Sequence, residues 1–397
     1  MNREDFPMLQ KNIIYLDNGA TTLKPQSVID ATTDYYQNYT ANAHRGDYDL
    51  SLKVDLAYEA VREKVRRFIH AREESEIVFT SGATESLNMI VKCFMKEHLQ
   101  SGDEVLLTKS EHASNLLPWL ELAKELGIQI RYIPLTKTHQ VTMENIKKVT
   151  TSKTKVISVA AITNVLGDIR PIHEIGLFCK EHNIYFVVDG AQSAPHSETD
   201  VIEDEIDFFA FSAHKMLGPT GVGVLYGKKE LLEEMHPLKV GGGMNQTFRA
   251  DGFYEYQALP LRLEAGTQNI AGVIAFGEAI DYLSNIGFEK IKRQEHELKE
   301  YFLKQSKEVE DLIIYNPDTS STTIAFNLKD VFAGDTAAYL NTYHICIRAG
   351  NHCAKILKDE LGVANTCRIS FYFYNSKDEI DFLIKVLKNA KNVFRKV

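Results

Sequence analysis

The chain has 397 residues, a length that suggests one large domain or two domains, with enough residues to bury a sizeable core. Hydrophobic residues make up 44% and charged residues 25%, which is ordinary for a soluble globular protein. The formal net charge of −9 argues against nucleic acid and anionic membrane as main partners. Because the first residues lack an apolar signal region and no run of 18 apolar residues occurs, we expect a cytoplasmic protein without a membrane partner.

The five cysteines form an odd and scattered set with no CxxC pair. This spacing predicts neither a disulfide framework nor a zinc site, so we expect at least one free thiol and no metal. Cys93 and Cys179 fall on expected helices, and Cys346 and Cys367 fall on expected strands, which are positions typical of buried cysteines. Cys353 differs from them because it falls on an expected loop.

Short apolar runs alternate with segments of helical periodicity through the first 230 residues. We expect strands at residues 13–16, 77–80, 105–107, 128–133, 156–160, 185–188, 206–211 and 223–227. Between them we expect helices at residues 25–39, 54–70, 86–98, 118–126, 142–149 and 172–182. This alternation predicts an α/β domain with a mostly parallel sheet, and the near-continuous apolar run at 156–160 is typical of a parallel strand buried on both faces.

The rest of the chain predicts a smaller α+β unit. Two loops, 241–244 and 264–269, enclose a polar and aromatic stretch, and two long helices follow. We expect these helices at 269–286 and 288–309, then strands at 322–327, 345–349 and 368–372, and helices at 335–343 and 377–394. Asp335 is a plausible N-cap for the first of the last two helices. Because no linker rich in Pro, Gly or Ser separates the units, we expect a tightly packed large domain, 15–268, and a small domain formed by 1–14 and 269–397.

Polar groups follow the carboxyl ends of several expected strands. They are Thr84 in the turn 81–86, then His112, Asn164, Asp189 with Gln192, and Lys215. Ligands in open α/β sheets bind outside the carboxyl ends of the strands, so this pattern predicts one ligand site there.

Lys215 follows the apolar run 206–211 and precedes a glycine-containing turn. A lysine at the end of a buried strand is poorly solvated, so its neutral amine becomes accessible near pH 7. A neutral amine is the form that makes a Schiff base with an aldehyde. Taken alone, an ordinary surface lysine before a glycine turn is the plainer interpretation of this residue.

Pyridoxal phosphate, an aldehyde with a pyridine ring and a phosphate, matches this set of groups. Its phosphate needs a helix N-terminus and polar side chains, which are offered by Ala83, Thr84, Ser212 and His214. Asp189 can keep the ring nitrogen protonated, Gln192 can donate to the phenolic oxygen, and His112 can stack on the ring. Each also has a plainer interpretation: an N-cap for Thr84 or Asp189, and a structural turn histidine for His112.

An amino-acid substrate adds a carboxylate and needs a cation to hold it. Arg368 can bind a carboxylate bidentately, with Asn164 assisting, although a surface ion pair is the plainer interpretation of the arginine. The loop 350–354 supplies Cys353 beside His352 and near Arg348. A thiol in such a polar loop can be nucleophilic.

Taken together, these motifs resemble the group II (SufS-like) cysteine desulfurases of the class V aminotransferase superfamily, over nearly the whole chain. The matching segments are 15–17, 42–46, 111–112, 164–167, 189–192, 212–216, 218–227, 264–267, 352–354 and 367–368. The resemblance implies fold type I of the pyridoxal-phosphate-dependent transferases, with a mostly parallel seven-stranded sheet flanked by helices and a smaller α+β C-terminal domain. It also implies a homodimer that converts L-cysteine to L-alanine.

The resemblance also assigns roles to individual residues. Lys215 would form the Schiff base, and His112 would stack on the ring and assist proton transfer. Cys353 would take the substrate sulfur as a persulfide and pass it to an acceptor protein of SufU or SufE type for iron–sulfur cluster assembly. The remaining assignments are substrate contacts from Asn164, Arg368, Arg348 and His44, and a phosphate contact from Thr267 of the other subunit.

Three positions depart from the pattern of the family that the chain resembles. Ala113 stands where a second histidine is frequent, Asn351 stands in a Gly-His-His-Cys segment, and Gly243 stands in a Gly-Gly-Glu-Met segment. None of them removes an expected cofactor contact. The alternative activities are those of a selenocysteine lyase or another class V β-lyase or aminotransferase, with selenocysteine as a possible substrate.

Overall fold

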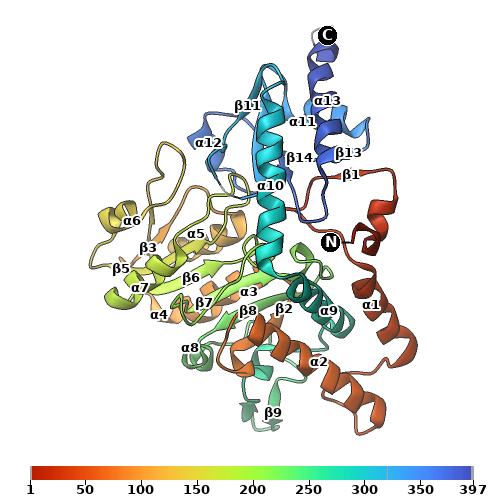
Figure 1. Cartoon of the computed structure of the whole chain (residues 1–397). Helices are drawn as coiled ribbons and strands as arrows, with labels where there is room; N and C mark the ends of the chain where they lie inside the picture. The colour runs from red at the N-terminus through yellow and green to blue at the C-terminus, as the bar shows by residue number, and fades with distance from the viewer. Residues whose placement is uncertain (1, 320, 395–397) are drawn as a thin grey trace.

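The computed structural model describes residues 2–319 and 321–394, and a seven-stranded sheet lies at its centre (Figure 1). The order of the strands is β2-β8-β7-β6-β5-β3-β4, and β8 runs antiparallel to both of its neighbours. Their bounds are β2 Ile77–Thr80, β3 Glu104–Leu107, β4 Gln129–Tyr132, β5 Thr154–Ala160, β6 Tyr185–Asp189, β7 Phe208–Ser212 and β8 Gly223–Gly227. The parallel strands β3 to β7 leave their carboxyl ends at one edge of the sheet. The predicted α/β fold with a mostly parallel seven-stranded sheet is confirmed.

Alternation of side chains along the strands divides the core into two layers. Val187 faces one layer while Phe186 and Val188 face the other, and the same alternation holds for Phe208 and Phe209. Strand residues alternate between the faces of a sheet, so a continuous apolar run can bury both faces. Helices therefore cover both sides of the sheet.

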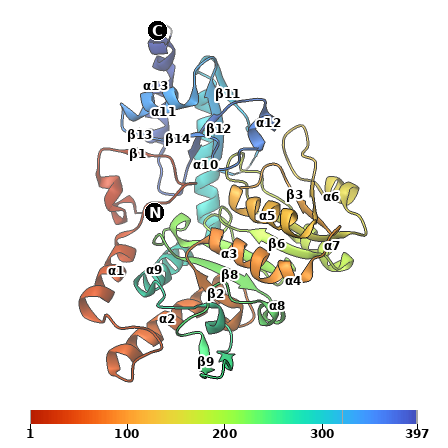
Figure 2. The same ribbon diagram turned by 180° about the vertical axis from the view of Figure 1, so that it is seen from behind.

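Each face of the large sheet is covered by its own set of helices. On one face lie the helical segment α3 Ala83–Met89, the π-helical turn Ile90–Met95 and α4 Lys96–His98, together with α5 Leu117–Leu126 and α8 Lys229–Glu234. On the other face lie α1 Gln26–Asn38, α2 Asp49–Phe68, α6 Met143–Val149, α7 Ile172–His182 and α9 Ile270–Ile286. The turned view of Figure 2 brings α3, α4 and α5 to the front.

A second, smaller sheet lies above the first in Figure 1. It has the order β11-β12-β15-β14, with the bounds β11 Leu312–Ile314, β12 Thr323–Leu328, β14 Arg348–Gly350 and β15 Thr366–Ser370. Its helices are α10 Phe288–Ser306, α11 Ala333–Asn341, α12 Leu357–Leu361 and α13 Lys377–Phe394. The long helix α10 extends from the large unit to the smaller one. Its Leu298 and Phe302 are buried in the core of the smaller unit.

The N-terminal segment ties the two units together. Strand β1 Ile14–Tyr15 pairs in parallel with β13 Ile345–Cys346. Residues 17–22 then cross to the large sheet, where the backbone N–H of Thr22 donates to the carbonyl of His214 at 3.0 Å. None of the helices within the described residues is both long enough and apolar enough to cross a membrane.

Most expected elements agree with the structure to within a few residues, and the differences have physical causes. Asp335 is not an N-cap: α11 begins two residues earlier at Ala333, after Phe332. The single strand expected at 345–349 is two strands in different sheets, because β13 pairs with β1 while β14 pairs with β15. The sequence pattern did not reveal β11, α12 or the hairpin of β9 Asn245–Phe248 and β10 Tyr254–Tyr256.

A close backbone approach at Gly223 provides a test of the packing. A Cβ atom added at Gly223 of β8 would lie 2.3 Å from the Cα of Gly82. We expect Gly223→Ala to lower the free energy of unfolding by about 1–3 kcal/mol, as overpacking does in tight interiors. Urea unfolding measures this change. Gly241→Ala is the control, since a Cβ there meets nothing within 4 Å, and equal losses in both variants would contradict the expectation.

Candidate functional site

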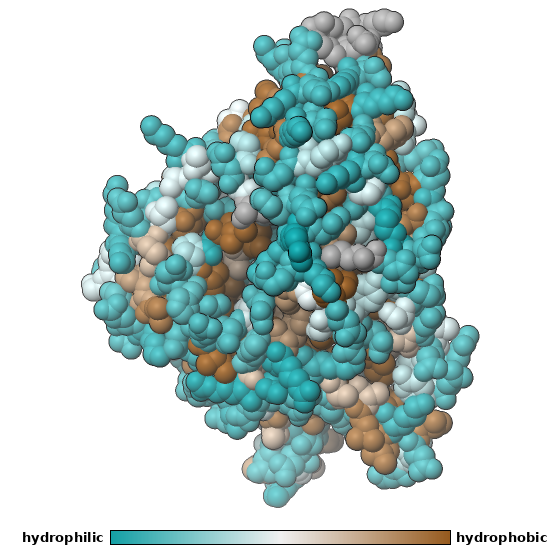
Figure 3. All heavy atoms as spheres, in the orientation of Figure 1, coloured by the Kyte–Doolittle hydropathy of each residue, from teal (hydrophilic) through white to brown (hydrophobic). Residues whose placement is uncertain are grey.

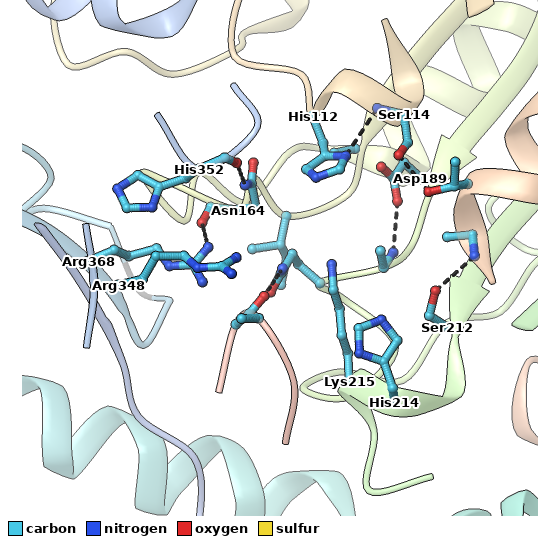
Figure 4. A pocket seen from close by; sticks show the side chains of 18 residues that line it. His112, Ser114, Asn164, Asp189, Ser212, His214, Lys215, Arg348, His352 and Arg368 are labelled. Atoms are coloured by element: carbon cyan, nitrogen blue, oxygen red, sulfur yellow. Dashed lines mark hydrogen bonds between the residues drawn. The ribbon is translucent and has the colours of Figure 1, made fainter. Parts of the chain in front are cut away.

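A cavity of about 190 Å³ opens where the carboxyl ends of β5, β6 and β7 face the smaller sheet. One water molecule needs only about 10–15 Å³ of such space, so the cavity has room for a small organic group. Figure 4 shows side chains from both sheets pointing toward it. The cavity is lined by most of the residues predicted from the sequence, namely Ala83, Thr84, His112, Asn164, Asp189, Gln192, Ser212, His214, Lys215, Arg348 and Arg368.

Lys215 ends a short 3-10 turn, Ala213–Lys215, directly after β7. The turn is fixed because the N–H groups of Met216 and Gly218 both donate to the carbonyl of Ala213 at 2.9 Å. Burial lowers the pKa of the Lys215 amine to about 8, with Asp189 opposing the shift and Arg368 and Arg348 adding to it. About a tenth of this amine is therefore neutral at pH 7, far more than for an ordinary lysine, and the neutral form is the one that attacks an aldehyde.

Asp189 ends the buried strand β6, and its side chain lines the cavity. Its Oδ1 accepts a hydrogen bond from the N–H of Ala191 at 2.9 Å. Burial raises the pKa of the carboxyl group, while the bond from Ala191 and the charge of Lys215 oppose the shift. A cationic partner inside the cavity would hold this carboxyl group in its ionised form. A protonated pyridine nitrogen is such a partner.

Small hydroxyl side chains gather at the start of α3. The N–H of Ala83 donates to Ser212 Oγ at 2.8 Å, and the hydroxyls of Thr84 and Ser114 lie 2.7 Å apart. Gly82 has a φ of +154°, which favours glycine at the entry to the helix. Backbone N–H groups at a helix start together with hydroxyls can accommodate a phosphate. Sequence analysis missed Ser114, although it lies only two residues after His112.

His112 is held in its neutral form. Its Nδ1 accepts a hydrogen bond from the N–H of Ser114 at 3.1 Å. Burial lowers the pKa of the imidazole to about 4, and the charges of Lys215, Arg368 and Arg348 add to the effect. A neutral ring can pack against an aromatic cofactor without the cost of burying a charge.

Glu111, the residue before His112, forms a fully buried ion pair with Arg170. Glu111 Oε2 accepts hydrogen bonds from Asn115 Nδ2 and from the N–H of Ala160, both at 2.9 Å. Because these partners lie in the segment after His112 and at the end of β5, the pair fixes His112 against the strand that precedes Asn164.

Arg368 on β15 reaches the cavity from the smaller sheet. Its Nη1 donates to the backbone carbonyl of Asn164 at 2.8 Å, and its side chain is 1% exposed. Arg368 Nε and Asn164 Oδ1 are buried without a hydrogen-bond partner among the described residues. Buried polar groups are normally paired, so these atoms indicate a place for a polar ligand.

Cys353 is exposed and does not line the cavity, but its loop closes against it. The N–H of Ala113 donates to the carbonyl of Cys353 at 2.7 Å, and Asn164 Nδ2 donates to the carbonyl of His352 at 2.6 Å. His352 and Cys353 both have a positive φ, 51° and 57°, which is uncommon for residues other than glycine. The two bonds therefore hold a strained backbone in place.

Thr267 and His44 lie outside the cavity in this single chain. Thr267 Oγ1 is 3.4 Å from Asn42 Nδ2, and His44 Nε2 is 3.1 Å from Glu59. The hydrogen bond with Glu59 raises the pKa of His44. A buried ion pair between Arg62 of α2 and Glu264, 2.7 Å long, holds the loop that carries Thr267 against this helix.

Comparison with known proteins agrees with this geometry. The family model described as "Aminotransferase class-V" matches residues 14–383. The chain belongs to the class V aminotransferase family. It is 43% identical over 396 residues to a probable cysteine desulfurase of Halalkalibacterium halodurans, covering 98% of this chain and 97% of that protein. It is 42% identical to a probable cysteine desulfurase of Staphylococcus aureus strain Mu50, covering 98% and 96%.

Solved structures of cysteine desulfurases superpose on nearly the whole chain. The cysteine desulfurase CsdA of Escherichia coli gives a TM-score of 0.92 at 36% identity, covering 98% of both chains. The cysteine desulfurase of Thermococcus onnurineus gives a TM-score of 0.93 at 36% identity, covering 98% of this chain and 96% of that chain. The fold predicted by the family resemblance is thereby confirmed.

The lowered pKa of Lys215 predicts a pH dependence in protein freed of cofactor. The neutral fraction of an amine rises with pH until the pH exceeds its pKa. We expect reductive methylation of Lys215 by formaldehyde to accelerate between pH 7 and about pH 8 and then to level off. Mass spectrometry of peptides measures the rate. Lys96 is the internal control, because Glu125 raises its pKa, and a Lys215 rate still climbing steeply above about pH 9 would contradict the expectation.

The bond from Asn164 to the carbonyl of His352 predicts a limit on the mobility of Cys353. We expect Asn164→Ala to raise the alkylation rate of Cys353 by iodoacetamide about fivefold, since one hydrogen bond contributes about 1 kcal/mol. Mass spectrometry of the labelled peptide gives the rate. Asn145→Ala is the matched control, because Asn145 makes a similar bond to the carbonyl of Pro134 on the surface. An unchanged alkylation rate in Asn164→Ala would show that this bond does not restrain the loop of Cys353.

Proposed function

We propose that the chain is a pyridoxal-phosphate-dependent cysteine desulfurase that converts L-cysteine to L-alanine and leaves the sulfur as a persulfide on Cys353. The observation that carries this proposal is a low-pKa lysine, Lys215, in one cavity with a buried carboxylate, an arginine and the loop of an unpaired cysteine. Relatives named as cysteine desulfurases, 42–43% identical over nearly the full length, support the activity. In the balanced reaction, L-cysteine and the protein thiol give L-alanine and a protein persulfide.

The residues of the cavity fit the needs of the cofactor. When bound, pyridoxal phosphate supplies an electron sink that weakens bonds at the α and β carbons of an amino acid. Lys215 presents a neutral amine to an aldehyde and can afterwards carry a proton beside the substrate. Asp189 and Gln192 would contact the ring, and His112 would cover its face while remaining neutral. The phosphate would be held by the start of α3 and by Thr84, Ser212 and His214.

The substrate would be held by its carboxylate and reached by the thiol. Arg368 offers a buried guanidinium with an unpaired Nε, and Asn164 offers an unpaired Oδ1 within the same part of the cavity. Arg348 adds a second guanidinium at the rim. Cys353 lies beside the cavity, because its neighbour His352 lines the cavity and its own carbonyl accepts a hydrogen bond from the N–H of Ala113. A change in its loop would bring the sulfur inward.

We further propose a homodimer whose second subunit supplies Thr267 and brings His44 toward the substrate. Exposed apolar side chains support an interface at the start of α2 and on the β9–β10 hairpin, among them Tyr48, Leu52, Leu56, Phe248 and Tyr254. Figure 3 shows hydrophobic side chains gathered at the lower right, where Figure 1 draws this end of α2. Sedimentation velocity of the full chain measures the association, and a single-chain mass would sink the proposal.

The group II (SufS-like) subtype, a SufU- or SufE-type sulfur acceptor and a role in iron–sulfur cluster assembly complete the proposed function. The exposed thiol of Cys353 supports delivery of sulfur to a protein partner. A cytoplasmic location is supported by the five free cysteines, because reducing compartments keep thiols unpaired. We retain as a proposal the division into a large domain, 15–268, and a small domain of 1–14 and 269–397. Helix α9, which this division assigns to the small domain, packs in the core of the large unit.

The test of the activity is mass spectrometry of the holoenzyme after exposure to L-cysteine. We expect one added sulfur atom on the peptide of Cys353 and an equal amount of L-alanine. Cys353→Ala should lose the persulfide and most sulfur transfer, whereas Cys346→Ala, which changes a free cysteine of β13, should retain both. Sulfur transfer that persists in Cys353→Ala would refute the thiol role and indicate direct elimination, as in a lyase.

A further inference from the structure

Two arginines of the cavity lie directly opposite each other on neighbouring strands. Arg348 of β14 is the register partner of Arg368 of β15, so both side chains lie on the same face of the small sheet. Both line the cavity, with Arg368 buried and Arg348 about half exposed. Like charges directly opposite each other destabilise a sheet, so this pair calls for a counter-charge.

Asp17 supplies that counter-charge to both arginines. Its Oδ1 lies 3.0 Å from Arg368 Nη2, and its Oδ2 lies 3.6 Å from Arg348 Nε. The carboxylate is thus shared between the two guanidinium groups, one oxygen to each. Of the three charges, two are positive and one is negative, which leaves one net positive charge.

The backbone around Asp17 is fixed independently of these ion pairs. The N–H of Gly19 donates to Ser370 Oγ at 2.7 Å, and the N–H of Ser370 donates to the carbonyl of Leu16 at 2.8 Å. Asn18 Nδ2 also donates to the carbonyl of Ser370 at 2.7 Å. Ser370 lies two residues after Arg368 on β15. These contacts therefore hold Asp17 beside Arg368 without involving the carboxylate of Asp17.

The charges of the two arginines also change the pKa values of other groups in the cavity. Arg368 and Arg348 both lower the pKa values of Lys215 and His112. Burial lowers the pKa of Arg368 itself, and Asp17 opposes that shift. Asp189 and Lys215 are the other charged groups of the lining and have opposite signs. Figure 4 shows the two arginines side by side, pointing toward the centre of the cavity near Lys215.

We infer that Asp17 is a specificity-determining residue. By neutralising one of the two guanidinium charges, it adapts the site to an amino acid with one carboxylate and disfavours ligands that carry a second anionic group. The inference rests on the proposed function for its class of substrate. The single net positive charge of the cluster matches the single negative charge of the α-carboxylate of cysteine. Without Asp17, a second anionic group on the ligand would find an uncompensated guanidinium.

The test compares two ligands of the holoenzyme, L-alanine with one carboxylate and L-aspartate with two. Titrations followed by the visible absorbance of the bound cofactor give both dissociation constants without turnover of cysteine. In Asp17→Asn, which keeps the shape but removes the charge, we expect affinity for L-aspartate relative to L-alanine to rise at least tenfold, or about 1.4 kcal/mol. Asp281→Asn is the matched control, since Asp281 pairs with Lys64 away from the cavity, and its ratio should stay unchanged.

Two further variants separate a charge effect from a structural one. Asp17→Glu restores the charge and should restore the wild-type ratio, even if both affinities fall. Arg348→Gln removes one positive charge and should shift the ratio toward L-alanine, which keeps the test available if Asp17→Asn does not fold. An unchanged ratio in Asp17→Asn, or the same shift in Asp281→Asn, would overturn the inference. If the expected ratios appear in a protein that leaves L-cysteine intact, the desulfurase proposal fails and the charge selectivity stands.

Discussion

The position of one buried arginine fixes the geometry on which the rest of the site depends. Arg368 belongs to the small sheet, but its Nη1 bonds to the carbonyl of Asn164 at the carboxyl end of the large sheet. Its Nη2 bonds to Asp17 of the N-terminal segment. A guanidinium presents its donors in a rigid fork, so three distant parts of the chain are held in one relative orientation. Together with the bonds from Asn164 to His352 and from Ala113 to Cys353, this contact joins the two sheets beside the cavity.

Burial then determines the protonation of the groups inside. Burial lowers the pKa values of His112 and His214 to about 4 and that of His352 to about 3, so all three rings are neutral at pH 7. Burial also lowers the pKa of Lys215 to about 8. These shifts share one cause, the cost of placing a charge away from water. The same enclosure that removes water thus produces a reactive amine beside uncharged rings.

The loop of Cys353 is held by hydrogen bonds in a strained backbone conformation. Two hydrogen bonds to its carbonyl groups, from Ala113 and Asn164, hold two consecutive residues in the left-handed region. Asn164 is at the same time a candidate contact for the substrate carboxylate, with its Oδ1 unpaired. A ligand that engages Asn164 therefore acts on the bond that restrains the thiol. Under the proposed function, this arrangement would link occupation of the cavity to the position of the Cys353 thiol.

The sequence by itself determined the local structure and the groups at the strand ends. Short, nearly continuous apolar runs predicted every strand of the large sheet, because each strand must cover both faces with its own residues. Since strand direction follows from the α/β alternation, Asp189 and Lys215 were expected at one edge of the sheet.

Only the tertiary structure decided which distant residues share the site and in what balance of charge. Asp17 meets Arg368 across 351 positions of sequence, and Ser114 meets Thr84 across 30. The splitting of 345–349 between two sheets sets Arg348 opposite Arg368. No local pattern encodes these contacts, because they depend on register and packing between elements whose sequences carry only their own periodicity.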